Sequence, residues 1–286
     1  MKIFIQITFF LLFISVHSSF AEDSISFAVI GDAGHPTPKT EQIRLSIEDS
    51  NIQNLILPGD NIYDLSLTYD DVWSSWQGFK FPIVALGNHH QTYSEEIEYF
   101  SMPGEFYFKK FKGINFIVLN SDNTQNINAQ VSFFADKIKT ITKTEPLFIV
   151  FHHPPATVSY RHSWQEREAF HNAIRPILLR YRHKIDAILV GHDHQASIFS
   201  YGDIPVIVSG AIFEYFPSRE VDQYIDGAKA KTIWRFQSGH YWVRLDVDKK
   251  NKWNWINFIN VDSDTVDCSI RISRFHPMVV QPNCGK

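Results

Sequence analysis

The stretch Leu55-Ile56-Leu57-Pro58-Gly59-Asp60-Asn61-Ile62-Tyr63 contains the pattern that decides the fold. Three apolar residues end abruptly at a proline and a glycine, and an aspartate and a tyrosine follow. Short apolar runs that stop at glycine or polar residues suit buried strands rather than helices. Such runs recur along the chain at residues 25–30, 55–57, 83–86, 114–119, 147–151, 187–190 and 206–208.

Helix-like segments lie between several of these runs. They carry apolar side chains at helical spacing and cover residues 40–50, 128–141 and 164–182. The third segment opens with Ser163 and Glu166, which form the signature of a capping box, and contains Pro176, where we expect a kink. Strands prevail from about residue 204 onward, with a turn predicted at 249–252. This order of elements indicates an α/β fold built in layers.

Five of the apolar runs are followed by polar residues that can bind a cation. The motifs are Gly31-Asp32-Ala33-Gly34, Gly59-Asp60-Asn61-Ile62-Tyr63, Gly87-Asn88-His89-His90, His152-His153-Pro154 and Gly191-His192-Asp193-His194. Six of the thirteen histidines fall in three of these motifs. A single Gly-Asp pair is usually only a turn. Five such motifs in order indicate one site, because active sites of α/β sheets lie outside the carboxyl ends of the strands.

The residue types in these motifs indicate the chemistry of the site. Carboxylate, imidazole, amide oxygen and phenolate are ligands for borderline to hard cations, and a site without thiolate does not favour soft metals. One aspartate can bridge two ions about 3.5–4 Å apart, which is the arrangement for phosphoryl displacement. Such a pair lowers the pKa of bound water from about 15.7 toward 7. The motifs therefore predict two-metal hydrolysis of a phosphate ester.

The order of the five motifs resembles that of the calcineurin-like metallophosphoesterases, and within them the purple, or tartrate-resistant, acid phosphatases. The resemblance spans residues 31–194. It implies a four-layer α/β/β/α sandwich, in which two mixed sheets are flanked by helices, over residues 22–274. It also implies that phosphomonoesters are hydrolysed by attack of a metal-bound hydroxide, without a covalent enzyme intermediate.

The resemblance further implies which residues hold the two ions. The first ion would be bound by Asp32, Asp60, Tyr63 and His194, and the second by Asp60, Asn88, His152 and His192. The wider superfamily has a metal-binding histidine where this chain has Gly34, and in purple phosphatases a tyrosine takes over. Phenolate favours ferric iron, so we expect Fe(III) at the Tyr63 site and Fe(II), Zn or Mn at the second. The alternative for Tyr63 is a buried core residue.

Several histidines leave alternatives open. Either His152 or His153 could reach the metal, and the His-x-Pro spacing of the family favours His152. His89 resembles the residue that contacts the substrate phosphate and protonates the leaving alkoxide, a role that suits a pKa near 6.5. His162 resembles a further substrate-side histidine, but a solvated loop residue fits equally. His90 stands where related enzymes usually have aspartate, which leaves the support of His89 open.

The two ends of the chain differ from the rest. Residues 1–21 begin with a basic residue, continue with a short apolar stretch and end small-x-small, which predicts a signal peptide cleaved near Ala21. We therefore expect an exported protein, periplasmic or secreted, with an uncleaved anchor helix as the alternative. In an exported chain, Cys268 and Cys284 predict a disulfide, with two free thiols as the alternative. Residues 275–286 are expected to form an irregular tail.

The composition limits the possible partners. The chain has 286 residues, of which 44% are hydrophobic and 20% charged, as in an ordinary globular protein. Loss of residues 1–21 shifts the net charge from −4 to −5, because only Lys2 is charged there, so nucleic-acid binding is not expected. No stable membrane insertion is expected, and nothing indicates an oligomeric state.

The substrate would be a small phosphate ester. Alternatives are a phosphodiesterase or nucleotide pyrophosphatase, or a metal-binding protein without useful turnover.

Overall fold

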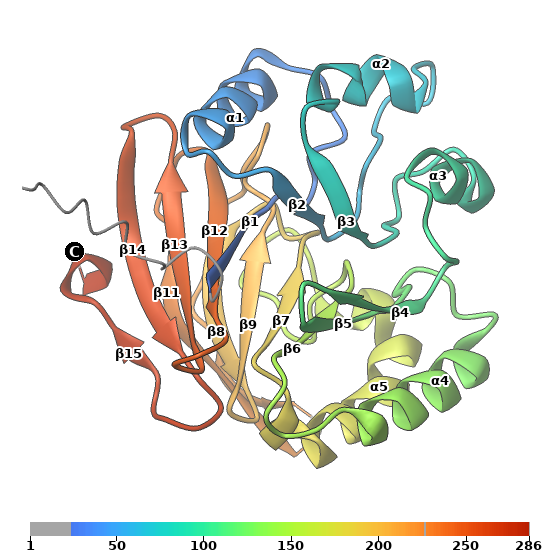
Figure 1. Ribbon diagram of the computed structural model, residues 1–286, viewed down its shortest axis with the longest axis vertical. Coiled ribbons are helices and arrows are strands. Elements are labelled where there is room, and N and C mark those ends of the chain that lie inside the picture. The colour runs from blue at the N-terminus through green and yellow to red at the C-terminus, as the bar shows by residue number, and fades with distance from the viewer. Residues whose placement is uncertain (1–23, 226, 286) are drawn as a thin grey trace, which may run out of the picture.

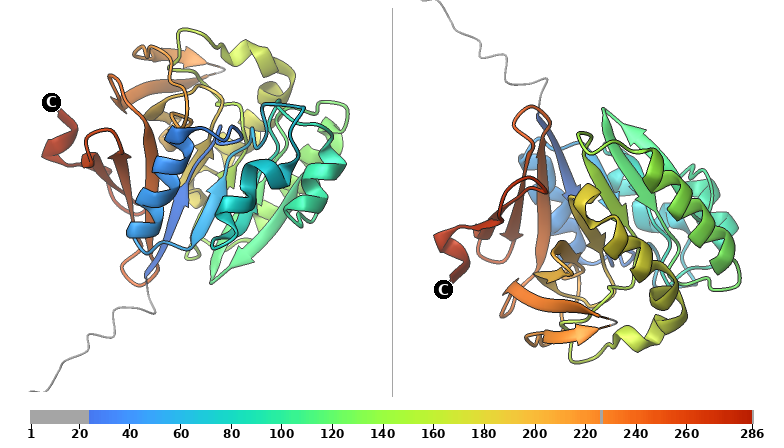
Figure 2. Two further views of the ribbon diagram at one scale, coloured as in Figure 1. Left: turned by 90° about the horizontal axis from the view of Figure 1, so that it is seen from above. Right: turned by 90° about the horizontal axis from the view of Figure 1, so that it is seen from below.

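Two β-sheets pack face to face and carry helices on their outer sides, as the computed structural model shows (Figures 1 and 2). It describes residues 24–225 and 227–285, so the predicted signal peptide lies outside the described residues. The expected sandwich of two mixed sheets flanked by helices is confirmed. Within the described residues, no helix has both the length and the apolar character needed to cross a membrane.

Both sheets are mixed. The first has the strand order β15-β14-β13-β12-β1-β2-β3 and the second the order β10-β11-β8-β9-β7-β6-β5-β4. The first consists of β1 Ser24–Val29, β2 Asn54–Leu57, β3 Lys80–Val84, β12 Tyr241–Asp248, β13 Trp253–Asn260, β14 Thr265–Ile272 and β15 Val279–Val280. The second consists of β4 Tyr107–Phe111, β5 Ile114–Val118, β6 Leu147–Val150, β7 Ala187–Val190, β8 Ala196–Tyr201, β9 Ile204–Ser209, β10 Asp222–Ile225 and β11 Ala228–Arg235. The strands β1, β2 and β3 pair in parallel, as do β5, β6, β7 and β9.

The helices begin and end where their local sequence dictates. They are α1 Pro38–Asp49, α2 Tyr69–Trp73, α3 Tyr93–Tyr99, α4 Ile127–Thr140 and α5 Glu168–Arg180, with 3₁₀ turns at Ser74–Trp76, Trp164–Arg167, Arg182–Lys184 and Pro282–Gly285. The side chain of Thr37 caps α1 by accepting from the backbone N–H of Thr40, and Pro38 is the first helical residue. Helix α5 continues past Pro176 to Arg180. The predicted helices at 40–50 and 128–141 therefore agree with α1 and α4, while a 3₁₀ turn precedes α5.

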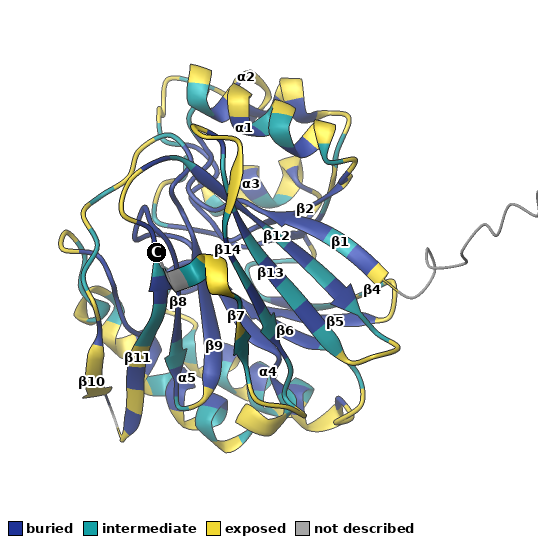
Figure 3. Cartoon of the chain, turned by 90° about the vertical axis from the view of Figure 1, so that its left-hand side faces the viewer, coloured by how far each residue is buried: buried dark blue, intermediate teal, exposed yellow. Residues whose placement is uncertain are grey.

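The strands of the second sheet separate two hydrophobic cores. In β5, Phe116 packs into the core between the sheets, whereas its neighbour Ile117 packs into the core that includes side chains of α4 and α5. The same alternation separates Phe148 from Ile149 in β6. Because both faces are covered, these strands are buried throughout, and the exposed residues gather on the helices and loops (Figure 3).

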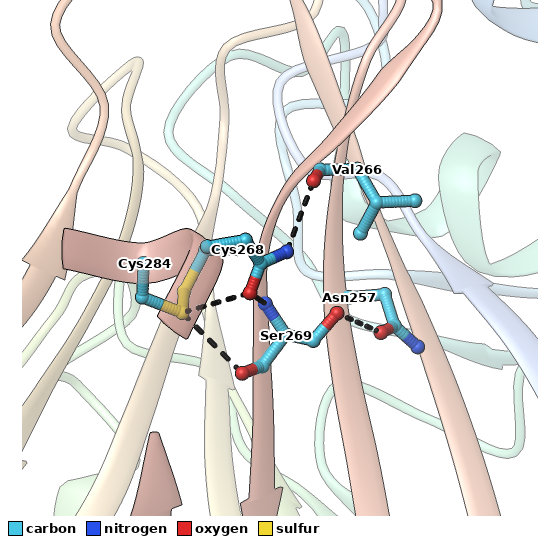
Figure 4. Close-up of a disulfide and its surroundings, with 6 residues drawn as sticks. Asn257, Val266, Cys268, Ser269 and Cys284 are labelled. Carbon is cyan, nitrogen blue, oxygen red and sulfur yellow. Dashed lines mark hydrogen bonds between the residues drawn. A yellow bond between two sulfur atoms is a disulfide. The ribbon is translucent and has the colours of Figure 1, made fainter. Parts of the chain in front are cut away.

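The tail is more regular than expected. The last short strand, β15, pairs with β14 and sets Ile270 opposite Val280, and a 3₁₀ turn follows. The expected disulfide joins Cys268 in β14 to Cys284 in that turn (Figure 4). It closes a loop of 16 residues, which stabilises a fold by about 3 kcal/mol in the chain-entropy view. The expectation of an irregular tail was therefore wrong for residues 279–280 and 282–285, because strand pairing and the disulfide hold them against the sheet, while residues 275–278 are irregular as expected.

Candidate metal centre

Turns that follow five strands hold most of the predicted ligands. Asp32 follows β1, Asp60 follows β2, Asn88 follows β3, His152 follows β6, and His192 and His194 follow β7. The first three strands belong to the first sheet and the other two to the second. The parallel strands of each sheet end at the same edge of that sheet. The two edges lie next to each other, since residues that follow β2 contact residues that follow β6 and β7. The site therefore straddles both sheets.

Several of these ligands have an unusual backbone conformation. Positive φ angles occur at Asp32 (58°), Asp60 (56°), His192 (67°) and His194 (49°). Such angles are uncommon outside glycine and persist where surrounding contacts hold them. Neighbouring glycines make room for the side chains: a Cβ on Gly87 would lie 2.1 Å from Asp60 Oδ1, and one on Gly191 would lie 2.6 Å from Asp32 Oδ2. The backbone is thus shaped around the two carboxylates.

The four residues expected at the first ion bring one atom each to a common point. The Tyr63 hydroxyl lies 3.1 Å from Asp32 Oδ1, 3.0 Å from Asp60 Oδ2 and 3.0 Å from His194 Nε2. Two carboxylate oxygens, a phenol and an imidazole nitrogen therefore converge. This set suits a hard cation.

His152, expected at the second ion, contacts the same oxygen of Asp60 as Tyr63 does, and its ring lies 5.1 Å from that of His192. His152 Nε2 lies 3.2 Å from Asp60 Oδ2, while its Nδ1 lies 2.9 Å from the carbonyl oxygen of Pro58. A carbonyl accepts only, so Nδ1 donates, and when the ring is neutral its lone pair lies on Nε2. The Oδ1 of Asn88 is buried without a hydrogen-bond partner among the described residues, which suits an atom that awaits a cation.

His152 and His153, either of which could reach the metal by sequence, make different contacts. His152 faces Asp60, whereas His153 places Nδ1 2.8 Å from the hydroxyl of Ser121 and packs its ring 4.2 Å from that of His192. The geometry thus agrees with the His-x-Pro spacing in directing His152 toward the bridging carboxylate.

The charges of the two aspartates provide a test of whether the residues fit a metal. Both are almost completely buried. Burial and the nearby Asp60 raise the pKa of Asp32 well above its usual value, although His152 opposes this. Burial also disfavours the charge of Asp60, but His152 outweighs it and lowers that pKa. The carboxylates compete for one partly compensating imidazole, so bound cations would relieve the buried negative charge.

Two of the three imidazoles expected as ligands are in the state that metal binding requires. Burial lowers the pKa of His194 to about 3 and that of His192 to about 4, so both rings are neutral near pH 7 and each has a free lone pair. Burial opposes the charge of the third, His152, but Asp60 and Asp32 outweigh it and raise its pKa to about 9, so that ring has to lose a proton when a cation binds.

Burial and the charges of Asp32 and Asp60 raise the pKa of Tyr63 well above its usual value. The phenol therefore stays protonated unless a cation stabilises the phenolate. Together with the orphaned Asn88 oxygen, this donor set fits two metal ions.

A cavity of about 290 Å³ opens onto this cluster. Of the predicted site residues, it is lined by Asp60, Tyr63, Asn88, His89, His162, His192 and His194. Asp32 and His152 lie behind these side chains and are fully buried. A larger cavity of about 700 Å³ lies beside α1 and strands β12 to β14, and none of the predicted site residues lines it.

The two histidines expected on the substrate side both line the cavity. The backbone N–H of His89 donates to Asp60 Oδ1 at 2.9 Å, and its ring lies 4.3 Å from that of Tyr63. The ring of His162 lies 4.1 Å from that of His192, which favours the substrate-side position over a solvated loop. His90 packs against a tyrosine ring instead, and burial lowers its pKa.

Sequence reasoning missed several residues of the site. Phe216 stacks on His194 at 4.7 Å, and the guanidinium of Arg161 lies 4.3 Å from the centre of the same phenylalanine ring. Phe213 packs 5.0 Å from Tyr63. These residues form a wall of the cavity, but no motif marks the segment after β9. Glu166, noticed only as a capping residue, lies 2.9 Å from His192 Nε2.

Sequence comparison identifies the family. Residues 25–196 match the profile of the calcineurin-like phosphoesterases, so the chain belongs to this family, as the motifs predicted. Its members share a metallophosphoesterase domain, and the described residues contain clusters of histidine and acidic side chains that can hold metal ions. A search of curated protein sequences finds no match. The purple acid phosphatase branch is not distinguished by these findings.

A solved structure shows the same fold at low sequence identity. The chain is similar to GAP50, the anchor in the inner membrane complex of Plasmodium, with a TM-score of 0.69 and 13% identity over 87% of this chain and 89% of that one. It also matches YfcE, a phosphoesterase from E. coli, with a TM-score of 0.44 and 11% identity over 86% of this chain and 98% of that one. The first likeness supports the fold alone.

Proposed function

We propose that this protein is a binuclear-metal phosphatase that hydrolyses small phosphomonoesters, with a ferric ion at the Tyr63 site. The observation that carries the proposal is the position of Asp60 Oδ2. It lies 3.0 Å from the Tyr63 hydroxyl of the first ligand set and 3.2 Å from His152 Nε2 of the second. One carboxylate oxygen thus contacts a member of each set, which allows it to bridge two ions.

Asp32, Tyr63 and His194 would hold the first ion, and Asn88, His152 and His192 the second, with Asp60 between them. Two such ions would clamp the phosphate oxygens and lower the pKa of a bound water from about 15.7 toward 7. The imidazole of His89 is exposed in the cavity, where it can carry a proton to the leaving alkoxide. His162, beside His192, lies on the substrate side of the ligands.

The size of the cavity favours monoesters over diesters. A volume of about 290 Å³ lies at the lower limit of ordinary ligand pockets, about 300 Å³. The aromatic side chains Phe213 and Phe216 line the cavity, which limits the room for a second ester group. A phosphodiesterase or nucleotide pyrophosphatase would need space on both sides of the phosphorus.

The test compares two substrates of the same chromophore, p-nitrophenyl phosphate and bis(p-nitrophenyl) phosphate. We expect kcat/KM to favour the monoester by about tenfold or more, which corresponds to about 1.4 kcal/mol in the transition state. Initial rates of p-nitrophenol release at several pH values below 7 measure it. A clear preference for the bis ester would overturn the monoesterase proposal and establish the diesterase alternative.

The rival hypothesis is a metal-binding protein without useful turnover. GAP50, which shares the fold, is an anchor in a membrane complex, and fold alone does not establish catalysis. Hydrolysis is favoured by the site instead, because every predicted ligand is present and two histidines without a ligand role line the same cavity.

We also propose that the chain is exported after cleavage near Ala21. The disulfide supports this, because such bonds persist mainly in oxidising compartments. The mass of the protein recovered from the exported fraction tests it. We expect a chain that begins at Glu22 and lacks free thiols, whereas an intact residue 1–21 segment would establish the anchor alternative.

A further inference from the structure

Glu166 connects a loop to the metal centre through its two carboxylate oxygens. Its Oε1 accepts from the backbone N–H of Ser163 at 2.8 Å, which completes the capping box. Its Oε2 lies 2.9 Å from Nε2 of His192 and 3.3 Å from Nδ1 of His162. One oxygen thus serves the loop, and the other serves two imidazoles of the site.

The contact with His192 determines which nitrogen of that ring can bind a cation. A neutral imidazole carries its proton on one nitrogen and a lone pair on the other. An ionised carboxylate only accepts hydrogen bonds, so Nε2 of His192 donates to Glu166. The lone pair of His192 then lies on Nδ1, and only this atom is available to a metal ion.

We propose that Glu166 is a positioning residue of the metal centre, which holds His192 in the tautomer that offers Nδ1 to the second ion and keeps His162 beside it. This inference rests on the proposed two-metal site. A carboxylate that accepts from a ligating histidine orients the ring and raises its basicity, and loss of such a partner typically weakens metal binding by about 10- to 100-fold.

Glu166 is itself exposed, but the loop that carries it is held in place on both sides. The loop that carries it is fixed at its start, where the Thr157 hydroxyl donates to Asp193 at 2.7 Å. It is fixed at its end by the ion pair of Arg167 with Asp122. Both anchors act before any metal binds, so the carboxylate is already directed at His192.

A different role for Glu166 would be direct coordination. Ligand atoms of His162, Glu166 and His192 lie within 4.8 Å of one another, so they could themselves surround an ion. In that arrangement His192 would use Nε2, and the chain would bind a third ion or shift the second toward Glu166. The protonation of His192 and the metal count separate the two roles.

The experiment uses the full-length protein loaded with Zn²⁺, which is diamagnetic, and the variants Glu166→Ala and Glu166→Gln. Competition with a chromophoric chelator measures the affinity of each site. We expect two zinc ions per chain in all three proteins. In Glu166→Ala, one affinity should fall by about 10- to 100-fold while the other stays within about threefold. Glu166→Gln keeps the size of the side chain but has one accepting oxygen instead of two. It can accept from the Ser163 N–H or from His192 but not from both, so its loss of affinity should not exceed that of Glu166→Ala.

Nitrogen-15 NMR of histidine-labelled protein supplies the second measurement. In the zinc-loaded wild type, we expect His192 to show a protonated Nε2 that exchanges slowly with water, and in Glu166→Ala that proton should exchange rapidly. Ser163→Ala alters the same capping box but keeps the Glu166 carboxylate, and Glu168→Ala removes an exposed carboxylate two residues away. Neither control should change zinc affinity or the His192 signal.

Each outcome has a defined meaning. Unchanged zinc affinity and an unchanged His192 proton in Glu166→Ala would overturn the proposal. Three zinc ions in the wild type and two in Glu166→Ala would replace it with direct coordination, and an equal loss in Ser163→Ala would reduce it to a role in loop structure. If Glu166→Ala behaves as expected but the wild type hydrolyses no phosphate ester, the proposed function fails and the role of Glu166 stands.

Discussion

Replacement of Asp60 by asparagine is expected to abolish hydrolysis and to remove at least one of the two metal ions. Asp60 Oδ1 accepts from the backbone N–H of His89 at 2.9 Å, so the amide oxygen of an asparagine has to take that position. The amide NH₂ then replaces Oδ2, the atom that faces Tyr63 and His152. An NH₂ group donates hydrogen bonds and has no lone pair for a cation.

The expected loss of hydrolysis is on the order of 10³-fold or more, because the ions account for the activation of the bound water. Metal content per chain by plasma mass spectrometry and release of p-nitrophenol measure the two effects. Asp64→Asn is the matched control: this carboxylate lines the same cavity but belongs to neither ligand set. Far-UV circular dichroism checks the fold of both variants. Hydrolysis by Asp60→Asn at the wild-type rate would contradict the two-metal mechanism.

The site residues that follow the strands were predictable, because their place in the sequence determines where they lie in the fold. Asp32 comes three residues after the last residue of β1, and Asp60 comes three residues after the last residue of β2. A parallel pair of buried strands leaves such residues little freedom about which edge they reach. The residue types then indicate a cation. The layered fold follows from the same runs, because strands that are apolar on both faces need cover on both sides.

Other parts of the site were not predictable, because their partners are distant in the sequence. Phe216 reaches His194 after the chain has passed through β8 and β9 and folded back, where the Phe216 N–H donates to the His194 carbonyl. The capping box identified Glu166 and one of its oxygens. The partner of the other oxygen depends on how the Trp164–Arg167 turn faces β7, which no local pattern records.

Short and exposed elements were also missed. Strand β10 is exposed at Asp222, Gln223 and Tyr224, so it lacks the alternation that predicts a strand. Helix α3 spans only seven residues, which is too few for a clear helical period. The positive φ angle of Asp60 could not be predicted from the sequence either, because aspartate adopts that conformation only occasionally. It is explained by the hydrogen bonds that its turn makes, including the one from the Gly34 N–H to the Asp60 carbonyl.

Tyr63→Phe is the second variant with a large expected effect, because it removes one atom at the point where the proposed first ligand set converges. The hydroxyl lies 3.0–3.1 Å from Asp32, Asp60 and His194, while the ring packs 5.0 Å from that of Phe213. Phenylalanine preserves the ring and deletes the only phenolate of the set. A phenolate is a hard, anionic ligand, so its loss removes the preference for ferric iron.

In the wild type, we expect about one iron per chain and a broad tyrosinate band in the visible spectrum; in Tyr63→Phe the band should disappear and the iron content should fall severalfold. The second ion should remain, because Asn88, His152 and His192 are unchanged. Tyr69→Phe is the matched control, since its hydroxyl is also hydrogen-bonded to a buried carboxylate, that of Glu96 at 2.9 Å, but lies outside both ligand sets. It should keep the colour and the iron. A colourless wild-type protein with two zinc or two manganese ions would overturn the ferric assignment. The bridging role of Asp60 would remain, because it depends on the position of one carboxylate oxygen and not on which metals that oxygen joins.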